Sequence, residues 1–316
     1  MSDKRHVEVF GPCRQLGRTG FLATRVGIGD IADRAVPLEA CVATLRRALE
    51  AGLNVIDTAP GYEAGYSEQM VGQAVREHGR EKVFVVDKID HLHDPVAPQV
   101  RSSLRTLGLE AADAFLFHGV SQVSDWRQIA APGGGMAQLD ACRREGRCRF
   151  VGLSTHHPDV AGEAVASGLC DLILLPIGPW VDPRYTDEIL PMAKSRGIGT
   201  LAMKTFGAGK LICDTSGYGK PLAHRPRGKL SSGGSDAADA PALPRLSVRE
   251  CVHYTLSWDA DVTLLGMSFP NEQDPAFEAV LDFSGPLSAA AMADIRTRAL
   301  AAVEGKGPSW WDPPRD

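Results

Sequence analysis

The chain has 316 residues, 44% of them hydrophobic and 23% charged, which is the composition of a globular protein with apolar material for one large core or two smaller ones. Its formal net charge of −5 gives no basic surface of the kind that attracts phosphate backbones or anionic lipids, so nucleic acid and membrane partners are not expected. The first residues hold no apolar leader, and no apolar run approaches the roughly 18 residues of a membrane helix, so we expect a cytoplasmic protein.

Seven cysteines are spread along the chain, an odd number, and none forms a C-x-x-C pair. The sequence therefore lacks the usual spacing of a zinc or iron–sulfur site. We expect reduced cysteines that mostly pack as small buried hydrophobic side chains, and no bound metal.

Short apolar runs typical of buried strands recur along the chain, and each is followed by a segment with the apolar spacing of a helix. Eight strands are predicted: Arg25–Ile28, Asn54–Asp57, Val83–Asp87, Ala114–Phe117, Phe150–Ser154, Asp171–Leu174, Gly199–Met203 and Val262–Leu265. The predicted helices are Leu38–Ala51, Glu68–Glu77, Val96–Leu107, Met136–Glu145, Val160–Ser167, Asp187–Arg196, Ser247–Trp258 and Ala276–Leu281. Glycines follow most of these helices, as C-terminal caps do.

This alternation predicts a parallel sheet with helices outside it, and eight units favour a closed (β/α)8 TIM barrel. The barrel would take the whole chain, residues 1–316, as one domain with a short N-terminal extension. The alternative is an open doubly wound sheet, whose usual sign is a G-x-G-x-x-G turn after the first strand. Gly27 and Gly29 begin such a turn, but Asp30 follows and the motif is not completed. We therefore predict the barrel.

Residues 214–246 interrupt the alternation because they are rich in Gly, Ser, Ala and Pro and lack periodicity. They are predicted to form a long mobile loop after the seventh strand. This loop is either a disordered insertion or a lid over a bound cofactor. The C-terminal tail, residues 305–316, either covers a substrate pocket with Trp310 and Trp311, packs on the outside of the barrel or is disordered.

Three polar residues occur at the ends of successive predicted strands. Asp57 ends the second strand, and Lys88 and His118 come just after the third and the fourth. Because they are one β/α unit apart, they are expected at the same height and meet at the C-terminal mouth, where barrel enzymes carry out their chemistry. A structural ion pair between Asp57 and Lys88 is the alternative, but a buried pair contributes little net stability.

Tyr62 lies in the loop that leaves the second strand, shortly after Asp57. The reference pKa of tyrosine is about 10, so an unassisted phenol does not ionise at neutral pH. A neighbouring ammonium, here Lys88, favours the phenolate and is expected to lower that pKa, while Asp57 holds the lysine charged and in place. Tyr62 is therefore predicted to be a proton donor.

Asp57 begins the segment D-T-A, Tyr62 follows it and precedes S-E, and His118 ends L-F-H. Together with Lys88, these residues resemble the catalytic tetrad of the aldo-keto reductase family in order and spacing. The segments GLSTH and LAMKTFGAGKL resemble one bacterial branch of that family, and the similarity covers most of residues 16–281. The resemblance implies a nicotinamide cofactor at the mouth, hydride transfer to a carbonyl carbon and a proton from Tyr62. His118 would orient the carbonyl and stabilise the developing oxyanion.

The resemblance also suggests where the cofactor binds. Ser154 and Thr155 would lie near the carboxamide of the nicotinamide, and the segment after the eighth strand resembles the contacts to the adenosine 2'-phosphate and adenine. The residues of that segment are Gly266, Ser268 and Gln273. The lysines and glycines after the seventh strand suit a pyrophosphate: Lys204, Gly207, Gly209 and Lys210.

Two departures from the family pattern stand out. Family members commonly carry a basic residue just beyond the serine equivalent to Ser268, where this chain has F-P-N. NADP(H) is still expected in preference to NAD(H), with Arg225, Arg227 or Lys229 of the long loop as a possible source of the missing charge. Glu63 replaces the glycine that commonly follows the tyrosine.

The sequence therefore favours an NADP(H)-dependent oxidoreductase that reduces an aldehyde or ketone to an alcohol, or catalyses the reverse. One alternative is a non-catalytic nicotinamide-nucleotide sensor or binding subunit. Another is a lyase or epimerase that uses Tyr62 and Lys88 without net redox change. The loops hold no readable code for a particular carbonyl or alcohol substrate, and the resemblance implies a monomer or a homodimer.

Overall fold

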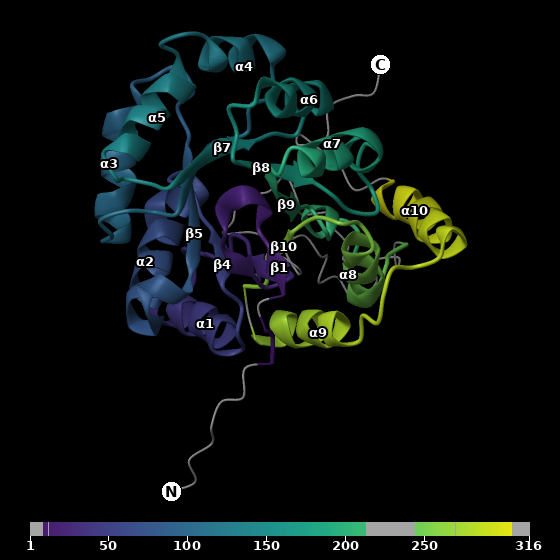
Figure 1. The fold of residues 1–316 in the computed structure, drawn as a ribbon. Helices are drawn as coiled ribbons and strands as arrows, with labels where there is room; N and C mark the ends of the chain where they lie inside the picture. The colour runs from purple at the N-terminus through teal and green to yellow at the C-terminus, as the bar shows by residue number, and fades with distance from the viewer. Residues whose placement is uncertain (1–8, 12, 213–243, 269, 305–316) are drawn as a thin grey trace, which may run out of the picture.

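The barrel is built from eight parallel strands that close into a ring. The computed structural model describes residues 9–11, 13–212, 244–268 and 270–304. Neighbouring strands in the ring follow the order β10-β3-β4-β5-β6-β7-β8-β9, with helices around them (Figure 1). The predicted (β/α)8 fold is confirmed. The predicted mobile loop lies outside the described residues except for 244–246, and the predicted tail, residues 305–316, lies outside them entirely.

All eight predicted barrel strands are present: β3 (Val26–Ile28), β4 (Val55–Asp57), β5 (Phe84–Ile89), β6 (Ala114–Phe117), β7 (Phe150–Ser154), β8 (Leu172–Pro176), β9 (Gly199–Met203) and β10 (Val262–Leu265). One boundary needs a correction that affects the site. β5 continues to Ile89, so Lys88 lies within the strand and not after it. Its backbone pairs there with Leu116 of β6.

The alternation of side chains along each strand separates two apolar cores. In β5, Phe84 and Val86 belong to the core inside the barrel, whereas Val85 belongs to the core between the strands and the helices. Because side chains on a strand alternate with a period of two, Lys88 continues the inward-facing series. Asp87 faces the outer layer instead. This parity decides which polar groups can meet inside the barrel.

The N-terminal segment covers the end of the barrel where the strands begin. Its hairpin consists of β1 (Arg14–Gln15), the 3-10 turn η1 (Gly17–Thr19) and β2 (Leu22–Ala23), and it lies across the centre of the ring in Figure 1. Leu16 is fully buried in the inner core, and the backbone N–H of Gly17 donates to Asp261 at the start of β10. The opposite end, where the strands finish, is left for the functional side chains.

The described helices are α1 (Leu38–Glu50), α2 (Tyr66–His78), α3 (Val96–Leu107), α4 (Val123–Ala130), α5 (Gly135–Arg144), α6 (Pro158–Ser167), α7 (Leu190–Ser195), α8 (Val248–Leu256), α9 (Pro270–Leu281) and α10 (Ala289–Val303). A π-helical turn, Tyr185–Ile189, forms the start of the predicted helix Asp187–Arg196, and α7 forms most of the rest. Neither α4 nor α10 was predicted from the sequence. In the described part of the chain, none of the helices combines the length and apolarity that a membrane crossing requires.

Gly72 in α2 and Gly162 in α6 are mid-helix glycines with opposite surroundings. A Cβ at Gly72 would lie 1.9 Å from the carbonyl oxygen of Leu107, whereas a Cβ at Gly162 meets no described atom within 4 Å. We expect Gly72→Ala to destabilise the fold by about 1–3 kcal/mol, because α2 must move away from the end of α3. Gly162→Ala should stabilise it by about 0.5–1 kcal/mol. Urea denaturation measures both, and equal stability of the two variants would contradict the close approach of α2 to α3.

Candidate active site

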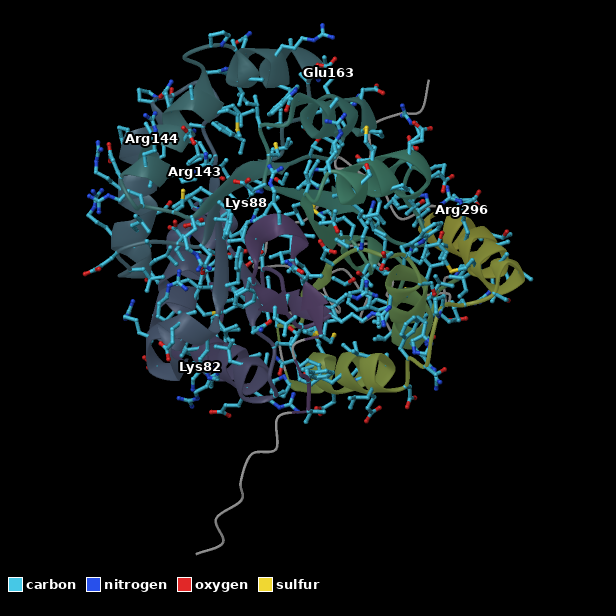
Figure 2. All side chains as sticks on the ribbon, in the orientation of Figure 1. Lys82, Lys88, Arg143, Arg144, Glu163 and Arg296 are labelled. Atoms are coloured by element: carbon cyan, nitrogen blue, oxygen red, sulfur yellow. The ribbon has the colours of Figure 1, made fainter. Side chains whose placement is uncertain are left out.

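The register of the barrel strands brings Lys88 to Asp57 at the carboxyl end of the barrel. Asp57, the last residue of β4, pairs with Val86 of β5 and so lies next to the inward-facing lysine. Lys88 Nζ donates to Asp57 Oδ1 at 2.6 Å and to the carbonyl oxygen of Thr58 at 2.7 Å. The side chain of Lys88 has no exposed surface, and it lies near the centre of the molecule in Figure 2. Its ammonium is therefore held inside the mouth.

Tyr62 and His118 complete the predicted group of four. Tyr62 begins a short turn, η2 (Tyr62–Gly65), and its ring centroid lies 4.6 Å from Lys88 Nζ. His118 directly follows β6, and its ring centroid lies 5.3 Å from that of Tyr62 with the ring planes nearly perpendicular. The structure thus brings all four residues together at one end of the barrel.

The pKa of Tyr62 differs from the sequence expectation. Burial raises this pKa well above its ordinary value, and the nearby carboxylates raise it further, with Asp57 as the strongest contributor among them. The expectation of a lowered pKa for Tyr62 is therefore wrong. Burial also raises the pKa of Asp57, although the charge of Lys88 and its hydrogen bond oppose this effect. The phenol accordingly keeps its proton at neutral pH.

The turn that carries Tyr62 has a left-handed backbone. Glu63 has a φ of 50° and Ala64 a φ of 54°, and both are followed by Gly65 at 84°. Left-handed backbone costs a residue with a Cβ about 1–2 kcal/mol, so two such residues in succession must be held by their surroundings. Glu63 stands where the resemblance leads one to expect glycine. Such strain clusters at functional sites.

Asp90 is a member of the site that was not predicted from the sequence. Its Oδ1 lies 2.6 Å from His118 Nδ1, and its Oδ2 accepts the backbone N–H of Gly61 at 2.5 Å. The signal was present in the sequence, because Asp90 follows Lys88 by two residues and therefore has the same parity on an extended chain. It was overlooked because β5 was predicted to end before Lys88.

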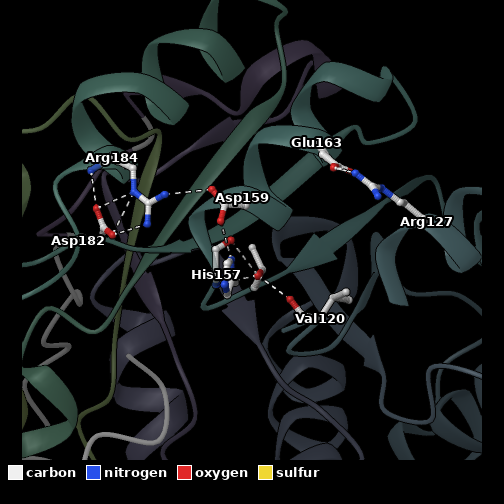
Figure 3. A network of polar contacts seen from close by, with 8 residues as sticks. Val120, Arg127, His157, Asp159, Glu163, Asp182 and Arg184 are labelled. Carbon is white, nitrogen blue, oxygen red and sulfur yellow. Dashed lines mark hydrogen bonds and ion pairs between the residues drawn. The ribbon is translucent and has the colours of Figure 1, made fainter. Parts of the chain in front are cut away.

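Ser154 and Thr155, predicted near the carboxamide, form hydrogen bonds within the protein. Ser154 Oγ accepts the backbone N–H of Gly119 at 2.9 Å, and Thr155 Oγ1 donates to the carbonyl oxygen of Val120 at 2.6 Å. Both residues therefore hold the turn that immediately follows His118. Figure 3 shows Val120 and His157 in this network. A contact with the cofactor stays a prediction for both residues.

The segment after β9 is only partly as expected. Lys204 is partly exposed and has a left-handed φ of 70°. Burial, followed by the charges of Lys204 and His118, lowers the pKa of His156 to about 3. Lys210 is fully buried, and burial lowers its pKa. Of the two predicted pyrophosphate lysines, Lys204 is the better placed.

The predicted pyrophosphate glycines lie in the turn η5 (Gly207–Gly209). Gly207 has a φ of 56° and Gly209 a φ of 89°, and Ala208 between them is also left-handed at 54°. This backbone conformation favours glycine at both predicted positions. The turn follows β9 at the same end of the barrel as the four proposed catalytic residues.

The segment after β10 includes one predicted residue that is engaged elsewhere. Gly266 directly follows β10, and the backbone N–H of Ser268 donates to Glu272 Oε2 at 2.6 Å. The buried amide of Gln273 donates to the carbonyl oxygen of Thr44 at 2.9 Å and accepts from Arg47 at 3.0 Å. Gln273 is therefore better explained as a link between α9 and α1 than as an adenine contact.

Two buried hydroxyls at the ends of β9 and β10 test whether a nucleotide fits this region. Thr205 Oγ1 and Ser268 Oγ are both buried, and neither has a hydrogen-bond partner among the described residues. A buried hydroxyl without a partner is costly to a folded protein, and ordered water or a polar ligand can supply the missing partner. A dinucleotide that lies across the ends of these strands would supply one, so these residues fit a nicotinamide cofactor.

Asp87, on the outer side of β5, forms a buried pair with Glu68 of α2. Asp87 Oδ1 accepts the backbone N–H of Lys88 at 2.7 Å. Burial raises the pKa of Asp87 well above its ordinary value, and the charge of Glu68 raises it further. Burial also raises the pKa of Glu68. Two neighbouring buried carboxyls are expected to share a proton, since both cannot ionise at low energetic cost.

Asp87→Asn is expected to make the protein more stable at neutral pH and to leave its stability near pH 3 unchanged. Below about pH 4, this carboxyl is protonated in both the folded and the unfolded chain. As pH rises, the unfolded chain releases a proton that the folded chain retains, so wild-type stability falls until pH passes the folded-state pKa. The amide cannot ionise and escapes this loss. Urea midpoints across the pH range check it, and parallel pH curves for the two proteins would contradict the shared proton.

Comparison with known proteins gives consistent matches. A model of the Aldo/keto reductase family matches residues 25–233. The chain is 29% identical over 211 residues to an NADH-specific methylglyoxal reductase of Escherichia coli (strain K12), and the match covers 58% of this chain and 64% of that enzyme, which is less than two thirds of its length. It is 26% identical over 292 residues to L-galactose dehydrogenase of Arabidopsis thaliana, covering 85% of this chain and 88% of that protein.

A solved structure agrees with the fold. The aldo/keto reductase from Klebsiella pneumoniae in complex with NADP and acetate matches with a TM-score of 0.65 at 18% sequence identity, covering 94% of this chain and 98% of that one. At this identity, the likeness supports the barrel architecture and nothing finer.

Proposed function

Because the chain belongs to the aldo/keto reductase family, we propose that it is an NADP(H)-dependent oxidoreductase that reduces an aldehyde or ketone to an alcohol, or catalyses the reverse reaction. One observation carries the proposal: Tyr62 lies between Lys88, whose Nζ is 4.6 Å from the tyrosine ring centroid, and His118, whose ring centroid is 5.3 Å away. A protein that only binds a nucleotide has no need for a phenol and an imidazole side by side against a buried ammonium.

Tyr62 is the proposed general acid. Its raised pKa keeps the proton on the phenol until negative charge develops on the substrate oxygen, which then takes that proton. The ammonium of Lys88 stabilises the phenolate that remains, and Asp57 holds the lysine in position. His118 orients the carbonyl and helps to stabilise its developing charge. When bound, the reduced nicotinamide supplies the hydride that the carbonyl carbon accepts.

We propose NADP(H) as the cofactor, held at the ends of β9 and β10. The hydroxyls of Thr205 and Ser268, which have no hydrogen-bond partner in the described part of the chain, and the partly exposed Lys204 support a polar, anionic ligand there. The Klebsiella protein was crystallised with NADP, whereas the E. coli relative is named as NADH-specific. Titration of the purified protein with NADPH and with NADH is the measurement. Tighter binding of NADH would reverse the cofactor choice and leave the enzyme class unchanged.

The test of the proposed function is turnover with purified protein. We expect substrate-dependent oxidation of NADPH with a panel of aldehydes and ketones that begins with methylglyoxal. In the reverse direction, we expect reduction of NADP with a panel of sugars that includes L-galactose. Cofactor binding without turnover in either direction would favour a nucleotide-binding subunit. Conversion of a substrate with no change in the cofactor would favour a lyase or an epimerase.

A further inference from the structure

The carboxylate of Asp90 joins two loops of the proposed site. Oδ1 lies 2.6 Å from Nδ1 of His118, which follows β6, and Oδ2 accepts the N–H of Gly61, which precedes Tyr62. The side chains are mostly buried, with 18% of Asp90 and 24% of His118 exposed. One carboxylate therefore contacts the proposed carbonyl-orienting residue and the turn of the proposed general acid at once.

Gly61 indicates that this contact is built into the turn. Its φ of −73° is open to any residue, yet a Cβ at this position would lie 2.6 Å from Asp90 Oδ2. A side chain here would push the Asp90 carboxylate away from the turn, so glycine leaves room for this contact although the backbone conformation does not demand it. The chain keeps room for this oxygen directly before Tyr62.

The charge of the carboxylate determines which nitrogen of His118 carries a proton. Burial alone would raise the pKa of Asp90, but the hydrogen bond and charge of His118, together with the N–H of Gly61, lower it below its ordinary value. An ionised carboxylate has no proton to donate, so each contact requires a donor on the other side. His118 must then carry its proton on Nδ1, and Nε2 is the ring nitrogen left for a substrate.

We propose that Asp90 is a positioning residue that fixes His118 in its Nδ1–H form and presents Nε2 to the substrate oxygen. The inference rests on the proposed function. A neutral imidazole in this form has only a lone pair at Nε2, which can accept a hydrogen bond from a bound substrate, whereas the proton that leaves an alcohol during oxidation goes to Tyr62 in the reverse of the proposed reduction. It can donate to a carbonyl oxygen during reduction only as the imidazolium, whose positive charge the carboxylate balances.

The first test uses the wild-type protein without substrate. NMR of the imidazole nitrogens reports which one is protonated, and the His118 signals are assigned by their loss in His118→Gln. At a pH where the ring is neutral, we expect the proton on Nδ1, and a proton on Nε2 overturns the proposal. This measurement needs no turnover. A protein that is inactive with every substrate would refute the proposed function and leave the tautomer result standing.

The second test is Asp90→Asn. Asparagine has one acceptor oxygen, which the N–H of Gly61 occupies, so its amide donates to Nδ1 and forces neutral His118 into the Nε2–H form. We expect kcat/KM to fall by about 10- to 100-fold in both directions, because the carboxylate that balances the imidazolium is lost. Cofactor affinity should be unchanged.

Asp125→Asn is the matched control, because it also removes a carboxylate beside a histidine. Asp125 Oδ1 lies 3.3 Å from Nε2 of the more exposed His93, a pair outside the proposed machinery. We expect wild-type kcat and a wild-type His118 spectrum. A loss of kcat/KM in Asp90→Asn with the His118 tautomer unchanged would mean that Asp90 has only a structural role. Should Asp90→Asn not fold, the tautomer in the wild-type protein decides.

Discussion

Tyr62→Phe is expected to lower kcat by about 10²- to 10⁴-fold, the usual contribution of a positioned general acid, and to leave cofactor affinity unchanged. The substitution removes one hydroxyl and keeps the ring that packs against Lys88 and His118. Only the proton needed by the substrate oxygen is lost. Single-turnover measurements with saturating cofactor report the chemical step, and fluorescence titration reports cofactor binding.

Tyr66→Phe is the matched control for this prediction. The hydroxyl of Tyr66 donates to the carbonyl oxygen of Val36 at 2.7 Å, at the start of α2 and four residues from Tyr62. Loss of this hydrogen bond should lower stability by about 1 kcal/mol and leave kcat at the wild-type value. Were Tyr62→Phe as active as Tyr66→Phe, another group would have to supply the proton, and the proposed role of Tyr62 would fail.

The barrel could be predicted from the sequence because each strand is a buried apolar run and each intervening helix has one apolar face. α10 was not predicted, and the reason is physical. Its sequence is rich in alanine, which favours helix in any register, and its buried residues are Ile295, Ala299 and Ala302. Such small side chains leave no periodic stripe of large apolar residues to recognise.

The four proposed catalytic residues could be predicted because they are polar residues one barrel repeat apart. Their electrostatics could not. The sequence shows that Lys88 comes near Tyr62, but the pKa of the phenol depends on how deeply the ring is buried and on which carboxylates surround it. Asp90 was missed for a related reason, since its role depends on where β5 ends and on the close approach of Gly61.

Lys88→Met is expected to abolish measurable turnover and to destabilise the fold by about 3–5 kcal/mol, because it leaves a buried carboxylate without its partner. Burial raises the pKa of Asp57, and Lys88 is the first of the groups that oppose this. Without the lysine, that pKa must rise further. The folded variant then retains a proton that its unfolded chain releases above about pH 4. Its loss of stability relative to wild type should therefore be smallest in mild acid and should grow as pH rises.

The double variant Asp57→Asn, Lys88→Met separates stability from chemistry. It removes both buried charges, and replacing a whole ion pair is far less damaging than removing one member. We expect it to recover most of the stability lost in Lys88→Met and to lose the additional pH dependence, yet to stay inactive because no ammonium faces the Tyr62 ring. Urea denaturation and single-turnover assays on the three proteins measure this. Recovered activity in the double variant would show that the ion pair between Asp57 and Lys88 only stabilises the fold. A double variant no more stable than Lys88→Met would show that the aliphatic part of the lysine side chain, and not its charge, stabilises the barrel mouth.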